Sequence, residues 1–129
     1  STFGGNPVAI AAALKTIELL ERELVANSAS VGAYLQDGLR ALAQRHECIG
    51  DVRGLGMMIG VEFVKDSASN APAPELRDRV EMECYRRGLI ILGAGHNTIR
   101  WSPPLVLARE HVDVALEIFD EAISAALKE

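Results

Sequence analysis

The sequence has 129 residues, of which 49% are hydrophobic, so it is long enough for one domain with a core and too short for two of ordinary size. Thirteen Lys and Arg against 18 Asp and Glu give a net charge of -5 without a basic stripe, which argues against a nucleic-acid-binding or membrane-surface protein. Cys48 and Cys84 stand far apart and no apolar run approaches membrane-spanning length, so the composition favours a protein of the reducing cytoplasm over a disulfide scaffold or a membrane protein.

The chain opens with a turn that leads into a helix. A glycine pair permits the turn, Asn6 is a preferred helix N-cap, and Pro7 suits the first helical position because its missing N–H has no helical partner there. Such a start points backbone N–H groups and the positive end of the helix dipole outward, which suits a phosphate or carboxylate, and the Thr2 hydroxyl adds a further donor. Taken alone, however, this pattern is typical of any helix start.

Apolar residues at helical spacing extend this first helix to about Leu24. Its first half is apolar on every side and charge appears only from Lys15 onward, which indicates a helix that passes from one packed environment into another. A second helix is expected over roughly 27–45. Within it, Gly32 and Gly38 each weaken helicity by about 1 kcal/mol relative to Ala, which indicates close packing against a neighbouring element.

Two strands follow these helices. Residues 49–53 and 57–64 show strand patterns and are separated by a Gly-Leu-Gly sequence, which favours a tight antiparallel reversal. In the second strand alternate residues are apolar, as expected where one face of a sheet packs on helices. Arg53 stands at the turn, and its expected role is an ion pair with an acid of either strand, Asp51 or Glu62.

The rest of the chain contains a polar surface loop, two further helices and two further strands. In order, the sequence predicts a loop over 65–74, a helix over 75–87, a strand over 89–92, a loop over 93–97, a strand over 98–102 stopped by two prolines, and an amphipathic helix beginning near Arg109. This order predicts an α+β two-layer sandwich, with a small, mainly antiparallel sheet covered by helices. A ferredoxin-like module can be written from the same elements and stays open at this point.

Three stretches of the sequence stand out as a set. They are Ser-Thr-Phe-Gly-Gly-Asn-Pro at 1–7, followed by an alanine-rich helix, Gly-Asp-Val-Arg-Gly-Leu-Gly-Met-Met-Ile-Gly-Val-Glu at 50–62, and Ile-Arg-Trp-Ser-Pro-Pro-Leu at 99–105. In this order they resemble the class III, ornithine-aminotransferase-like, pyridoxal-phosphate enzymes of fold type I. The resemblance implies the C-terminal small domain of a larger aminotransferase, with residues 1–24 as a linking helix and 25–129 as the sandwich. It also implies contacts with the N-terminal and large domains of the parent chain, a homodimer partner, and amino acid and 2-oxo acid substrates.

Arg100 is the sharpest candidate for a binding residue. A guanidinium group is a planar, permanently charged fork that binds a carboxylate through two parallel hydrogen bonds. A lone Arg in a strand is more often a structural ion-pair residue, but the resemblance implies that the Arg of the Arg-x-x-Pro-Pro-Leu motif faces the active site and binds substrate carboxylates. Trp101 stands where the family usually has an aliphatic residue or Phe, a difference that can alter packing behind the arginine.

The same resemblance assigns cofactor roles to the start of the chain. Thr2, with Ser1 beside it, is expected to reach the phosphate of pyridoxal 5'-phosphate in the neighbouring subunit, which implies a dimer interface across the active site. The Schiff-base lysine that this chemistry needs is missing. Lys15, Lys65 and Lys128 lack its glycine-rich context, and in the family that lysine lies upstream of the first motif. The fragment therefore contains no catalytic residue and is expected to be inactive alone.

No metal site is predicted. The three histidines, His46, His96 and His111, are not clustered and are expected on the surface, with only His96 in a loop near Arg100. Neither cysteine belongs to a Cys-x-x-Cys pair of the kind that binds zinc.

These features lead to a hypothesis about the parent protein. It transfers an amino group from an ω-amino acid such as 4-aminobutyrate to 2-oxoglutarate, with Arg100 for a carboxylate and Thr2 for the partner's phosphate. The stretch 89–95 resembles the aminobutyrate branch of the family more than the acetylornithine branch. Two alternatives stay open: an amino-acid racemase of the same superfamily, and a non-catalytic regulatory α+β module that binds an amino acid between protomers.

Overall fold

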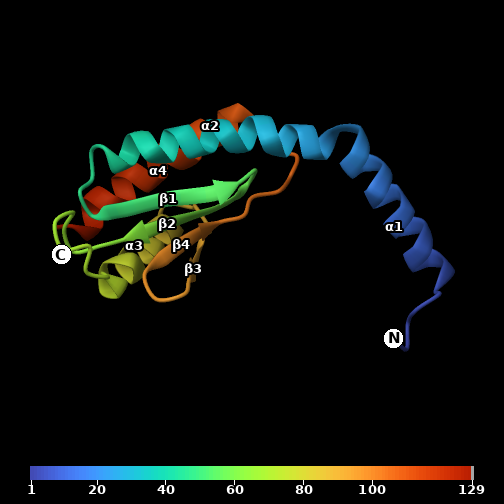
Figure 1. Cartoon of the computed structure of the whole chain (residues 1–129), viewed down its shortest axis with the longest axis horizontal. Helices are drawn as coiled ribbons and strands as arrows, with labels where there is room; N and C mark the ends of the chain where they lie inside the picture. Colours follow the sequence, from blue (N-terminus) through green and yellow to red (C-terminus); the bar gives the residue numbers. More distant parts are fainter. Residues whose placement is uncertain (129) are drawn as a thin grey trace.

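The computed structural model describes residues 1–128, and within them it confirms the predicted α+β architecture (Figure 1). The elements are, in order, α1 (Pro7–Leu19), the short π-helix η1 (Leu20–Leu24), α2 (Val25–Ala43), β1 (Ile49–Leu55), β2 (Met58–Phe63), α3 (Pro74–Arg86), β3 (Leu92–Ala94), β4 (Thr98–Trp101) and α4 (Arg109–Ala126). The expected division into a linking helix (1–24) and a sandwich (25–129) stays a prediction. The last residue of the expected sandwich, Glu129, lies outside the described residues.

The four strands form one sheet in the order β1-β2-β4-β3, and every neighbouring pair is antiparallel. Helix α3 joins β2 to β3, and these two strands run parallel on either side of β4. This is the split βαβ arrangement that ferredoxin-like modules also use, so the strand order does not contradict the ferredoxin-like alternative. Leu55 pairs with Met58, so the hairpin turn consists of Gly56 and Met57, slightly later than the sequence predicts. Gly56 has a φ of +56°, a left-handed conformation that favours glycine.

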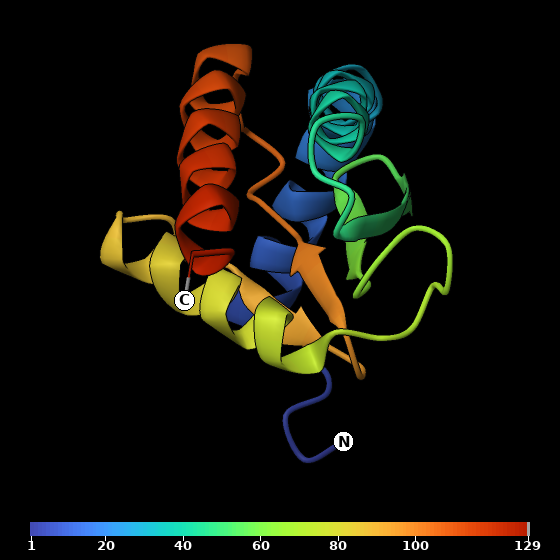
Figure 2. The ribbon, with the colours of Figure 1, turned by 90° about the vertical axis from the view of Figure 1, so that its left-hand side faces the viewer.

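Helices cover one face of the sheet and leave the other open. Alternate side chains of the two central strands, including Ile59, Val61 and Ile99, share one buried cluster with side chains of α2, α3 and α4. Figure 2 looks along α2, with α4 beside it, and α4 contacts both α2 and α3. The period-two pattern predicted for the second strand is thus confirmed, and the residues between the buried ones lie on the open face.

Aromatic rings join α4 to the covered face of the sheet. The ring of Phe119 packs edge to face with Phe63 and with Trp101, at centroid distances of 6.4 and 5.1 Å. Each such pair adds about 0.5 to 1.5 kcal/mol beyond the burial of its area. Trp101 is the last residue of β4, so this cluster anchors the strand from its helical side.

The first two helices are joined, which corrects the expectation of two separate segments. Asn6 caps α1 as predicted, because its Oδ1 accepts hydrogen bonds from the N–H groups of Val8 at 2.9 Å and Ala9 at 3.3 Å. The helical path then continues through η1 into α2 without a break, and it bends at the π-helical turn (Figure 1). Good helix formers fill this junction, so no Gly or Pro signals an end there.

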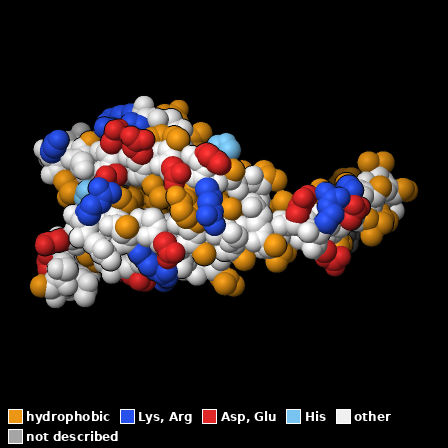
Figure 3. All heavy atoms as spheres, turned by 90° about the horizontal axis from the view of Figure 1, so that it is seen from above, with side chains coloured by type: hydrophobic (Ala, Val, Ile, Leu, Met, Phe, Trp, Pro, Cys, Tyr) orange, Lys and Arg blue, Asp and Glu red, His pale blue; other side chains and the backbone are white. Residues whose placement is uncertain are grey.

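α1 projects from the sheet and buries none of its residues. Phe3 before it and Leu14 within it are 82% and 63% exposed, and hydrophobic side chains gather at the far end of this projecting arm (Figure 3). An apolar surface of this kind is typical of an interaction site.

The strand predicted over 89–92 is wrong for most of its length. β3 begins only at Leu92 and runs to Ala94, while Leu89 and Ile91 pack on the core without pairing. A short apolar run indicates burial, but it does not distinguish a strand from an extended loop that packs on a core.

His46 is not the surface residue that the sequence predicts. His46 Nε2 lies 2.5 Å from Asp120 Oδ1, and Arg45 lies 3.0 Å from the other oxygen of the same carboxylate. The His46 side chain is only 11% exposed. This cluster joins the turn after α2 to the middle of α4, a contact across 74 residues that the sequence does not signal.

Between residues 1 and 128, no helix combines the length and apolar character needed to cross a membrane. Within the same range, no group of three or more His, Cys, Asp or Glu side chains is placed to bind a metal ion.

Candidate functional site

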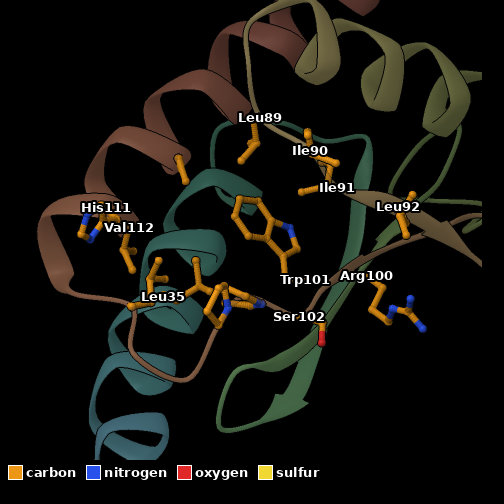
Figure 4. Close-up of a pocket in the computed structure, with 14 residues that line it drawn as sticks. Leu35, Leu89, Ile90, Ile91, Leu92, Arg100, Trp101, Ser102, His111 and Val112 are labelled. Carbon is orange, nitrogen blue, oxygen red and sulfur yellow. The ribbon is translucent and has the colours of Figure 1, made fainter.

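Arg100 lies on the open face of the sheet. In β4 it alternates with the buried residues Ile99 and Trp101, so strand geometry turns its side chain to the opposite side. Figure 4 shows the Arg100 side chain pointing away from the Trp101 ring. In the part of the chain that the structure describes, its guanidinium makes no ion pair and no hydrogen bond.

Arg53 shares this open face but is already paired. Its Nη1 donates to Asp51 at 2.8 Å and to Glu62 at 2.6 Å, which confirms the predicted ion pair. These two bonds raise the pKa of Arg53 above its ordinary value, and the bond to Asp51 has the larger effect. The strand register places Arg53 and Arg100 on either side of Gly60, which has no side chain. Of these two arginines, Arg100 is therefore the one free to bind an anion.

A groove of about 490 Å³ borders Arg100 (Figure 4). Its walls are mainly apolar and come from α2, the segment before β3, the end of β4, the loop that follows it and the start of α4. The lining residues are Leu35, Leu89, Ile90, Ile91, Leu92, Arg100, Trp101, Ser102, Pro103, Pro104, Leu107, His111, Val112 and Ala115.

Three polar side chains line this groove besides Arg100, namely Trp101, Ser102 and His111. The Nε1 of Trp101 is buried and has no hydrogen-bond partner among residues 1–128. The ring of His111 is exposed, and its Nδ1 accepts the N–H of Ala108 at 3.4 Å, so it replaces part of the missing cap of α4. Volume and lining are those of a small-molecule pocket, with charge only at the Arg100 edge.

The structure does not bring Thr2 and Arg100 together. Ser1 and Thr2 are exposed before the free end of α1, far from the sheet (Figure 1). The Asn6 side chain already accepts hydrogen bonds from the first free N–H groups of α1. Fewer backbone donors are therefore left for an anion at this helix start than the sequence suggests. The Thr2 hydroxyl, in contrast, makes no hydrogen bond within the described chain. It is therefore free to donate a hydrogen bond to a phosphate group bound in another subunit.

Among residues 1–128, no lysine is placed to hold pyridoxal phosphate covalently. Lys15 is exposed and forms an ion pair with Glu18 at 2.7 Å. Lys65 opens an exposed loop, and Lys128 follows α4. Residues 1–128 therefore fit a phosphate contact and a substrate contact, and they contain no lysine in a pocket that could hold the cofactor.

One residue that contacts the loop after β4 has no signal in the sequence. Asn27 lies in α2, and its amide reaches two carbonyl groups of the loop after β4. These contacts cross 78 and 80 residues of sequence, and no local pattern could reveal them.

Comparison with known proteins decides the family. The family model described as aminotransferase class-III matches residues 1–123. The chain belongs to this family. The resemblance drawn from the three sequence stretches is thereby confirmed.

Similar curated proteins include both transaminases and racemases. The chain is 43% identical to an alanine/serine racemase of Pyrococcus horikoshii, over 98% of this chain and 27% of the relative. It is 40% identical to an isoleucine 2-epimerase of Lentilactobacillus buchneri (96% and 28%) and 39% identical to the 4-aminobutyrate aminotransferase GabT of Escherichia coli (94% and 30%). It thus spans less than a third of the length of these relatives.

Solved structures agree with this assignment. A transaminase from the marine bacterium Virgibacillus superposes with a TM-score of 0.92 at 32% identity, over 99% of this chain and 30% of the other. An amine transaminase from an uncultivated Pseudomonas species, in its PLP-bound form, gives a TM-score of 0.89 at 34% identity, over 98% and 29%.

Proposed function

We propose that this chain is the small domain of a longer pyridoxal-phosphate-dependent aminotransferase that moves an amino group from an ω-amino acid, such as 4-aminobutyrate, to 2-oxoglutarate. The observation that carries the proposal is the exposed, unpaired guanidinium of Arg100 on the open face of the sheet, within an intact Arg-x-x-Pro-Pro-Leu motif. Pyridoxal phosphate, when bound, carries the amino group between donor and acceptor.

In this proposal Arg100 binds a substrate carboxylate. Its planar fork holds the two oxygens through parallel hydrogen bonds and so fixes both the position and the orientation of the substrate chain. The neighbouring Gly60 leaves room above the strands for that chain. Both 4-aminobutyrate and 2-oxoglutarate carry a carboxylate remote from the reacting carbon, so one arginine can serve both half-reactions.

Thr2, with Ser1 beside it, is proposed to bind the cofactor phosphate of the partner subunit. The exposed hydroxyls at the end of the projecting arm support this assignment, because an arm that leaves its own sheet is able to reach a second subunit. The parent would then be a homodimer with shared active sites, and the present chain would be inactive without the rest of the protein. A cytoplasmic location is proposed with it, since Cys48 and Cys84 are both free and buried.

A racemase is the second candidate. The identities of 40% and 43% to an epimerase and a racemase are as high as the 39% to GabT, so overall similarity does not separate the two reactions. The α-amino acids on which such enzymes act also carry a carboxylate for Arg100. Membership of an aminotransferase family weighs against the third possibility, the non-catalytic module.

The deciding experiment uses the full-length parent loaded with cofactor. Addition of 4-aminobutyrate without any keto acid should convert the lysine-bound cofactor into its pyridoxamine form, which is followed by visible absorption. An inverted amino acid without keto acid product would overturn the transaminase in favour of the racemase. The isolated chain should give a flat calorimetric titration with glutamate and 4-aminobutyrate, whereas measurable binding would favour the regulatory module.

The role of Arg100 is tested by Arg100→Lys in the same parent. Lysine keeps the charge but loses the fork, so kcat/KM for 4-aminobutyrate should fall at least about tenfold. Butylamine, which has a methyl group in place of the carboxylate, is the matched control substrate and should change less than about twofold. An equal loss on both substrates would contradict carboxylate binding by Arg100.

A further inference from the structure

The side-chain amide of Asn27 bridges two carbonyl groups of the loop that follows β4. Its Nδ2 donates to Leu105 O at 2.7 Å and to Leu107 O at 3.1 Å. Asn27 is partly buried in the first turn of α2, so solvent competes only weakly for these two bonds. One amide group thus uses both of its hydrogens on a single loop.

This loop has few other hydrogen bonds. It begins with Ser102, and the next two residues, Pro103 and Pro104, have no N–H to donate. Inside the loop, Leu107 N donates to Pro104 O at 3.0 Å. For residues 102–107 of the described chain, the only side chain that hydrogen-bonds to the backbone is that of Asn27.

The loop continues the strand that carries Arg100. Arg100 lies one residue before the end of β4, and the antiparallel ladders stop at Trp101 on the β2 side and at Arg100 on the β3 side. Beyond that point the direction of the chain depends on the loop. Ser102, both prolines and Leu107 also form a wall of the groove beside Arg100.

The neighbouring helical residue holds a different turn. Ser28 Oγ accepts the N–H of Met57 at 3.3 Å, in the turn between β1 and β2. The start of α2 therefore hydrogen-bonds to two loops through two adjacent side chains. Only the loop that Asn27 contacts is continuous with β4. Loss of the Ser28 hydrogen bond is therefore a matched control, because it removes a contact to the other loop from the adjacent helical position.

We propose that Asn27 is a positioning residue for substrate carboxylates: its two hydrogen bonds fix the loop after β4 and thereby the end of the strand from which Arg100 reaches the substrate. The proposal rests on the role of Arg100 proposed above. A displacement of an orienting group by about 1 Å can cost a reaction about 100-fold, so two bonds at the strand end are sufficient to matter.

The experiment compares Asn27→Ala, Asn27→Asp and Ser28→Ala in the full-length, cofactor-loaded parent. Asn27→Asp keeps the shape but replaces both donors by an anion that faces two carbonyl oxygens, so it should be at least as harmful as Ala. For both Asn27 variants we expect kcat/KM for 4-aminobutyrate to fall by about 10-fold to 100-fold, with butylamine changed less than about twofold. Ser28→Ala should leave the ratio between the two substrates unchanged.

A second readout does not depend on activity. Hydrogen exchange of the backbone amides at 105–108 should become faster in Asn27→Ala and stay unchanged in Ser28→Ala, while Met57 shows the reverse. Loss of activity on both substrates to the same extent, or unchanged exchange at 105–108, would overturn the positioning role.

Arg100→Ala in the same assays separates the two proposals. If it destroys the preference for 4-aminobutyrate while the Asn27 variants keep that preference, the positioning role is wrong and the proposed function stands. If Arg100→Ala keeps the preference, the proposed carboxylate site is wrong, and the positioning role, which depends on that site, is overturned with it.

Discussion

Gly32 of α2 lies directly against the hairpin turn between β1 and β2, and this contact predicts a large effect of a single methyl group. A Cβ at this position would lie 2.3 Å from both the carbonyl carbon and the oxygen of Gly56, and 2.8 Å from its Cα. All three are backbone atoms of the hairpin turn. Because Gly56 has a positive φ and Ser28 packs against it, this turn has little freedom to move away.

Two opposing terms set the size of the effect of Gly32→Ala. Alanine favours the helix by about 1 kcal/mol relative to glycine. Overpacking against a rigid neighbour costs about 1 to 3 kcal/mol, and contact with backbone on three atoms puts this case at the upper end. The net loss is therefore about 2 kcal/mol, which lowers the midpoint of urea unfolding by about 1 M for a chain of this size.

Gly38→Ala is the matched control, since this glycine lies in the same helix with an equally short contact. Its Cβ would lie 2.3 Å from Leu116 Cδ1, which is the end of a flexible side chain and can rotate away. The helical gain and the small repacking cost should nearly cancel, to within about 0.5 kcal/mol. Both variants are compared by far-UV circular dichroism in urea. Equal midpoints, or a more stable Gly32→Ala chain, would refute the close backbone contact between α2 and the hairpin.

Three further predictions concern the core and its edge. Burial raises the pKa of the Cys84 thiol to about 12, so iodoacetamide should leave this residue unmodified in the native chain and alkylate it after unfolding, as read by mass spectrometry. Hydrogen bonds from Arg87 and then Arg86 lower the pKa of Glu83 below its usual 4.5, so the stability it contributes is complete above that pH and disappears as the pH falls through the lower folded value. Thermal unfolding should therefore show Glu83→Gln less stable than the native chain near neutral pH, with the gap closing in acid. Phe119→Leu removes two edge-to-face ring pairs and should cost about 1 to 3 kcal/mol in urea unfolding; no change would contradict the aromatic anchor of β4.

Local sequence patterns predicted most of the helices and strands, because the contacts that define these elements lie between residues close together in the sequence. The Asn6 cap and the alternation in β2 both depend on contacts within a few positions. The close packing at the two helical glycines was also predicted, although the sequence did not identify the partners.

What the sequence missed depends on long-range contacts. The pair of His46 and Asp120 and the bridge from Asn27 each join residues more than 70 positions apart. The strand predicted over 89–92 failed for a related reason, since Leu89 and Ile91 pack on the core but only Leu92 of this stretch has a pairing partner. Apolar character predicts burial, whereas pairing is decided by the rest of the fold.

The candidate site was predicted by motif, and its physical logic comes from the surroundings of Arg100. On the open face, exposed apolar side chains border this arginine. Leu92 pairs with it across the strands, and Met58 and Leu55, which pair with each other, lie in the next row of side chains on the same face. We propose that the large domain of the parent covers this face. Covering would remove water from an unpaired guanidinium, which is costly unless an anion joins it. Arg53 would be covered without that cost, because it already has two carboxylates. The same closure would therefore select substrates that bring a carboxylate to Arg100 and reject amines that leave the charge buried and unpaired, which is the difference that the comparison of 4-aminobutyrate with butylamine measures.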